Sequence, residues 1–232
     1  MVVEKVPRWE SELWFLISCG DGENCPIYSQ CGFRLEGGWC IDDDKNRISR
    51  LVYSVDKDER LHSARFNFIK PVQYCEILSM IESLAQDWLQ KGRVFCPPVP
   101  SELALQADEH RRIEVRLVPL KTHNGAIWLL REGWVIHLKH DDPRTRQRFT
   151  LFHEAFHILA HCKSRKPVFR RVGAQCGTFN EVLTEAFATF VLMPEKWVRI
   201  KWAEVKDLDE LARIFQVSVP ALHGRLRMIG LI

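Results

Sequence analysis

The strongest constraint on this sequence is a pair of histidines four residues apart, His153 and His157, inside an apolar segment. Two residues at i and i+4 of a helix lie on one face, one turn apart, so both imidazoles can reach a single ion. Glu154 follows the first histidine, where its carboxylate suits a general base better than a ligand. This H-E-x-x-H spacing predicts a zinc site on a helix over residues 143–162.

The residues around the motif decide between a metal site and a chance string on a solvated helix. They are apolar on most sides: Phe149, Leu151, Phe152, Phe156, Ile158 and Leu159. A helix that is apolar on most sides is buried, and buried histidine and glutamate side chains need partners. The surroundings therefore favour the metal site over the chance string.

A catalytic zinc usually has three protein ligands, so a third must come from elsewhere in the chain. Glu181 and Glu185 share a face of the next predicted helix, 178–193. One of them would bind zinc while the other hydrogen-bonds a ligand histidine. The alternatives are a capping box for Glu181 and a solvated helix face for Glu185. His161 lies two turns beyond His153 and cannot converge on the same ion.

The remaining pattern predicts a mixed α+β fold. Helical spacing of apolar residues predicts a helix over 71–91, and a second short helix is expected over 101–111. Strands are predicted at 113–117, 126–130 and 134–138, with Asn124-Gly125 as a hairpin turn. Two short helices are expected in the tail, residues 207–232.

Residues 148–161, R-F-T-L-F-H-E-A-F-H-I-L-A-H, resemble the active-site helix of the ImmA/IrrE family of metallopeptidases. A second motif, E-V-L-T-E-A-F-A at 181–188, resembles that family's E-x-x-A-N-x-F-A and is followed by Leu-Met-Pro. In this alignment Glu181 falls on the zinc ligand. Glu185 stands where the family has Asn, and Thr184 replaces Ala. The resemblance covers residues 75–232 and implies a zincin-like α+β domain.

The resemblance also implies a function. The chain would be a zinc-dependent metallo-endopeptidase with His153, His157 and Glu181 as ligands, using zinc-activated water with Glu154 as general base. The substrate would be a protein, such as a transcriptional repressor or a mobile-element regulator. Three histidines are candidates for stabilising the oxyanion: His123, His137 and His161. Residues 207–232 resemble the helix-turn-helix-like end of the family, so DNA binding is an alternative for this tail.

A cysteine cluster marks the N-terminal section, residues 1–70, as a separate module ahead of the peptidase domain, 71–232. Its members fall within 22 residues: Cys19, Cys25, Cys31 and Cys40. Four thiolates would bind a second zinc or an iron–sulfur cluster, and four buried free thiols are the alternative. A metal- or redox-sensing protein that uses the zincin fold as a binding platform is therefore the second functional hypothesis.

Loop features add two weaker hypotheses. Cys176, between the two ligand helices, could occupy the open zinc position, although an ordinary loop thiol is the simpler interpretation. The basic segment 163–171 could meet an acidic partner, although a solvated loop is the default.

Composition bears on the compartment. The chain has 232 residues, eight cysteines and a net charge of +3. No apolar run approaches the roughly 20 residues that span a bilayer, and no leader with a basic and then an apolar region is present. We therefore expect a cytoplasmic protein without a membrane partner, whose small net charge does not itself predict nucleic-acid binding.

Overall fold

The computed structural model describes residues 9–10, 13–14, 17, 47–53, 66–163 and 178–232. Within these ranges the strands are β1 (Arg47–Tyr53), β2 (Phe66–Gln73), β3 (Arg112–Val118), β4 (Gly125–Leu130) and β5 (Gly133–Lys139). The helices are α3 (Tyr74–Lys91), α4 (Arg144–Lys163), α5 (Thr178–Leu192), α6 (Glu195–Val205), α7 (Leu208–Phe215) and α8 (Val219–Met228), with a short 3-10 helix η3 (Ser101–Gln106). The α+β expectation is confirmed.

Two compact units share the chain. The first comprises residues 1–80 and 163–181, and in its described part β1 pairs antiparallel with β2. The second comprises residues 81–162 and 182–232. The division passes through α3 and α5, each of which is one continuous helix. The predicted boundary at residue 70 between a cysteine module and a peptidase domain stays a prediction.

The sheet of the second unit has the strand order β3–β5–β4. β3 runs parallel to β5, and β4 runs antiparallel to it. The prediction of a hairpin turn at Asn124-Gly125 is therefore wrong. The hairpin joins β4 to β5, whereas the chain after β3 crosses to the opposite edge of the sheet before β4 begins at Gly125. The three predicted strands themselves are confirmed.

Side chains on these strands alternate between two faces of the sheet. The ring centroids of Trp134 of β5 and His161 of α4 lie 5.1 Å apart, so the sheet face that carries Trp134 packs against α4. Gly125 is paired with Leu138, four residues after Trp134, so Gly125 belongs to this same face. His137 belongs to the opposite face, where its ring centroid lies 6.3 Å from that of Trp128.

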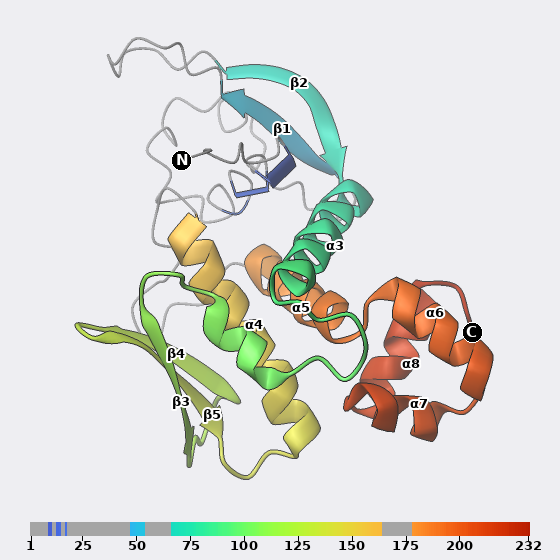
Figure 1. Ribbon diagram of the computed structural model, residues 1–232. Coiled ribbons are helices and arrows are strands. Elements are labelled where there is room, and N and C mark those ends of the chain that lie inside the picture. Colours follow the sequence, from blue (N-terminus) through green and yellow to red (C-terminus); the bar gives the residue numbers. More distant parts are fainter. Residues whose placement is uncertain (1–8, 11–12, 15–16, 18–46, 54–65, 164–177) are drawn as a thin grey trace. The chain divides into compact units, whose positions relative to one another are not determined.

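Helix α4 lies between the sheet and the helices α3 and α5, as Figure 1 shows. Phe156 of α4 packs against Phe187 of α5, with ring centroids 4.7 Å apart. Trp88 of α3 contacts both Phe187 and Phe152, at centroid distances of 5.3 Å and 6.1 Å. The predicted burial of the motif helix is confirmed, because apolar neighbours cover it on both sides.

The C-terminal segment forms three helices. Asp207 caps α7 by accepting a hydrogen bond from the Glu210 amide at 2.7 Å, and Ser218 caps α8 by accepting one from the Ala221 amide at 3.3 Å. The two helices expected in the tail are confirmed. Helix α6 was not expected, because Pro194, which ends α5, is also the residue from which α6 starts. Among the described helices, none combines the length and the apolar character needed to cross a membrane.

Candidate metal centre

Two histidines of α4 face one another. The Nε2 atoms of His153 and His157 lie 3.3 Å apart, and the ring planes meet at 71°. His157 is buried and His153 is half-buried. The i, i+4 geometry that the sequence predicted is therefore present, and it aims both ring nitrogens at the same space.

Helix α5 adds a carboxylate to this pair. Glu181, in its first turn, offers an oxygen that lies, with one nitrogen of His153 and one of His157, in a group whose members are all within 4.8 Å of one another. Two imidazoles and one carboxylate are the donor set of many catalytic zinc sites. Around a tetrahedral zinc, two nitrogens would lie about 3.3 Å apart, which matches the observed spacing of the histidines. The residues therefore fit a zinc ion in both chemistry and spacing.

The carboxylate of Glu154 lies against the sheet. A Cβ atom built on Gly125, the first residue of β4, would lie 2.5 Å from Oε1 of Glu154. The glutamate is buried, with 8% of its surface exposed. Its carboxylate thus lies at the start of β4, one residue along the chain from the half-buried His153.

Arg148 fixes the first turns of α4. Its guanidinium donates to the Val99 carbonyl and, at 3.0 Å, to Oγ of Ser101. It also lies 5.8 Å from the ring centroid of Phe152. Burial lowers the pKa of Arg148, opposed by the charge of Glu102. The arginine therefore ties the metal-bearing helix to the segment that leads into η3.

Asp108 performs a similar role at the other end of α4. Burial alone would raise its pKa. Hydrogen bonds from the His110 amide, the Trp134 indole, the Cys162 thiol and the Arg111 amide outweigh this effect and hold the pKa below its ordinary value. The Trp134 bond is 2.8 Å long and buried. Asp108 thereby joins the last turn of α4 to β5, a role with no local sequence signature.

The group that could hold a metal ion does not include the other predicted site residues. His161 packs on Trp134, and burial lowers the pKa of its imidazole. His137 belongs to the sheet face away from α4, so it cannot stabilise an oxyanion at the metal. His123 is exposed in the segment before β4. Glu185 is exposed one turn after Glu181, and its predicted bond to a ligand histidine stays a prediction.

Several predictions fall outside the described residues. They concern Cys19, Cys25, Cys31, Cys40, Cys176 and most of the basic segment 163–171. The second metal site and the occupation of the open zinc position by a thiolate therefore stay predictions.

Comparison with known proteins gives a family and a distant structural neighbour. The sequence profile of a peptidase family described as IrrE N-terminal-like domain matches residues 109–227. No curated protein matches the chain. Among solved structures, a Mycobacterium tuberculosis transcriptional regulator matches at a TM-score of 0.44 and 13% identity, over 63% of this chain and 46% of its own. The chain thus spans less than half the length of that regulator.

Proposed function

Since the chain belongs to the IrrE N-terminal-like family of peptidases, we propose that it is a zinc-dependent endopeptidase that cleaves a protein substrate. The observation that carries the proposal is the convergence of His153, His157 and Glu181, from two helices, on one space. The matched profile, residues 109–227, contains all three of these residues as well as Glu154.

The proposed chemistry divides between the ion and the chain. A zinc ion held by the three ligands supplies Lewis acidity, which polarises a carbonyl oxygen and makes water more acidic. Glu154 accepts the proton of the attacking water and then donates it to the departing amine, as a general base and acid. This role is supported by the place of Glu154, which directly follows His153 on α4 and is buried at the start of β4.

The sheet suggests how a peptide would approach. In the part of the chain that the structure describes, β4 forms one edge of the sheet, and its first residue lies next to Glu154. A free strand edge offers amide and carbonyl groups to an extended peptide, which can add as a further strand. We expect the scissile segment to lie along β4, with the bond to be cut next to Glu154.

The proposed substrate class is supported by the family resemblance and not by the site geometry. A repressor protein or a regulator of a mobile element is the substrate that the family favours. The tail helices α7 and α8 would then serve either in folding or in contacting such a partner.

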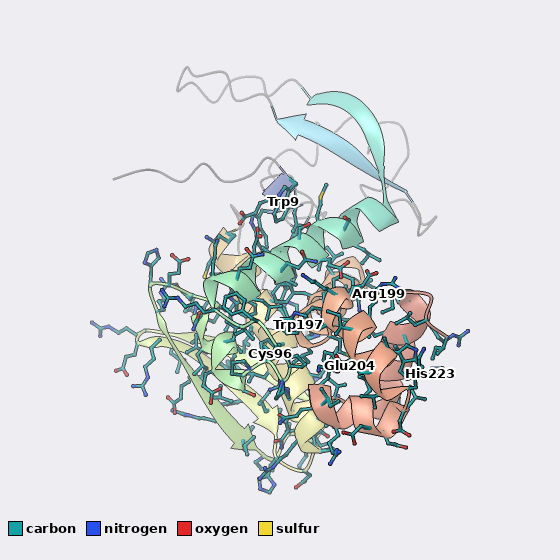
Figure 2. The ribbon with its side chains drawn as sticks, turned by 45° about the vertical axis from the view of Figure 1, so that its right-hand side comes forward. Trp9, Cys96, Trp197, Arg199, Glu204 and His223 are labelled. Atoms are coloured by element: carbon teal, nitrogen blue, oxygen red, sulfur yellow. The ribbon has the colours of Figure 1, made fainter. Side chains whose placement is uncertain are left out.

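The test is cleavage of a proteome-derived peptide library by the full chain, read by mass spectrometry. Glu154→Gln should retain zinc and lower the rate by about 10²–10⁴-fold, because it removes the base while preserving the shape. The matched control is Glu204→Gln on α6, where the side chain is exposed and pairs with Lys201 at 2.7 Å (Figure 2). Undiminished cleavage by Glu154→Gln would refute the proposal. No cleavage by either protein would favour a binding platform.

A further inference from the structure

We propose that Gly125 is a positioning residue for the base, because its bare Cα keeps open the space in which the carboxylate of Glu154 stands. The inference rests on the proposed peptidase function and extends it to a residue outside both motifs. It concerns three residues of one compact unit: Gly125 of β4, with Thr150 and Glu154 of α4.

The closeness of the strand to the helix is the first observation. A Cβ on Gly125 would lie 2.5 Å from Oε1 of Glu154 and 3.1 Å from its Cδ. It would also lie 2.5 Å from Cγ2 of Thr150. Contacts this short are repulsive between nonbonded heavy atoms, whose optimum separation is about 3.5–4.0 Å. Any side chain at residue 125 would therefore compete with the base for space.

Backbone conformation does not explain the glycine. Among the described glycines, a positive φ occurs at Gly133, with 147°, and at Gly230, with 70°. Gly125 instead lies in regular antiparallel register opposite Leu138, in a conformation open to any residue. Nor is Gly125 part of the hairpin turn, which joins β4 to β5. Room for neighbouring atoms is the remaining reason for glycine here.

The two neighbours would not yield equally to an added methyl group. Thr150 is β-branched, lies in a helix that restricts its χ1 angle, and has 8% of its surface exposed. The carboxylate of Glu154 is the end of a longer side chain with more rotatable bonds. The methyl group would therefore displace the carboxylate and leave the helix in place.

A methyl group at residue 125 should therefore affect the base, Glu154, and not the metal ligands. The atoms that approach residue 125 belong to Thr150 and Glu154, whereas His153 and His157 face each other. Gly125→Ala should therefore retain zinc and still bind peptide, yet turn over slowly. If Gly125 were needed only for folding, Gly125→Ala would lower stability, zinc content and activity together.

The experiment compares Gly125→Ala with the wild-type chain on a peptide taken from the library. Displacing a catalytic group by about 1 Å can slow a reaction about 10²-fold. We expect kcat to fall by about that factor, KM to stay within about twofold, and zinc content to be unchanged. Gly224→Ala on α8 is the matched control, because a Cβ there has no neighbour within 4 Å.

A rescue variant makes the test specific. Thr150→Ser removes the methyl group that a Cβ at residue 125 would also meet. The added methyl group can then shift toward residue 150 and away from Glu154. In the Gly125→Ala background Thr150→Ser should restore kcat at least about tenfold, relieving a displacement of the size just given. Wild-type kcat in Gly125→Ala, or a loss of zinc in parallel with kcat, would overturn the inference. Full activity of Glu154→Gln would instead remove the proposed function itself.

Discussion

Two of the places where the protein buries charged and polar side chains differ in what satisfies those side chains. In the tail, Arg225 is 2% exposed and is paired within the protein. It donates to Glu82 of α3 at 2.6 Å and to the Met193 carbonyl at 3.1 Å, and its guanidinium lies 4.5 Å from the Phe190 ring centroid. This cluster joins α8 to α3 and to the end of α5.

The second place is α4, where ring nitrogens of His153 and His157 lie close to each other and to a carboxylate oxygen of Glu181. Two ring nitrogens 3.3 Å apart beside a carboxylate form a donor set that suits a cation. Burial of a polar group is thus not itself a sign of function. The partners of a buried group decide its role: the Arg225 cluster is satisfied by protein atoms, whereas we propose that the α4 cluster is completed by zinc.

Removing the metal should produce the largest effect, and it should affect the α4 cluster but not the Arg225 cluster. Lewis-acid catalysis contributes several kcal/mol, so chelation should lower peptide cleavage by about 10³-fold or more. Adding zinc back should restore the activity. The Arg225 cluster should be unaffected, so the chain should keep most of its helical circular dichroism. Cleavage that survives exhaustive chelation would contradict the account.

Breaking the Arg225 cluster should affect stability and not chemistry. Arg225→Met leaves Glu82 without its cation. Removing one partner of a fully buried pair costs about 3–5 kcal/mol, and because Glu82 is 23% exposed we expect a smaller loss of unfolding free energy, about 1–3 kcal/mol. We expect kcat per folded molecule to change by less than about twofold, because no residue of this cluster is a proposed ligand. Urea unfolding would measure the loss. The control is Arg227→Met, an exposed neighbour on the same helix. Equal losses for the two variants would argue against the cluster.

Asp108, like Arg225, is a buried charged group that is hydrogen-bonded by protein atoms. Its pKa is lower in the folded protein than its ordinary value of 3.8, so its contribution to stability is present above that pH. The contribution is lost as pH falls through the lower folded pKa. Asp108→Asn should therefore cost about 1–3 kcal/mol at pH 7 and much less in strong acid. A difference that stays constant down to pH 2 would show that charge is not the cause.

The smallest expected effect is at Gly224, on the exposed side of α8. Alanine in a helix interior is favoured over glycine by about 0.5–1 kcal/mol, and a Cβ there would have no neighbour within 4 Å beyond the adjoining residues and the backbone of the helix itself. Gly224→Ala should raise the free energy of unfolding by that amount and leave cleavage unchanged. Thermal denaturation would reveal a destabilised protein if α8 needs this glycine.

Much of the site could be predicted from local pattern. The helix expected over 143–162 is α4, Arg144–Lys163, because apolar periodicity and a proline mark its start. The spacing of two histidines on one helix face fixed their pairing, and family resemblance selected Glu181 over Glu185. These predictions depend on residues near one another in sequence.

The parts that could not be predicted depend on tertiary contacts. Asn124-Gly125 is a strong local turn signal, yet the glycine lies in a strand against Glu154, 29 positions further along the chain. The strand order β3–β5–β4 likewise sets which residues meet α4, and it put His137 on the wrong face to assist the reaction. The partners of Asp108 and Arg225 come from other elements, so no periodicity reports them.

The zinc content of the full chain tests the central claim most directly. Metal analysis should compare the wild type with His153→Ala and with His223→Ala, an exposed histidine on α8 (Figure 2). Measuring the difference between variants cancels any metal held by the N-terminal cysteines. The account predicts that His153→Ala loses one zinc per chain and that His223→Ala loses none. Equal zinc in all three proteins would contradict the proposed metal centre.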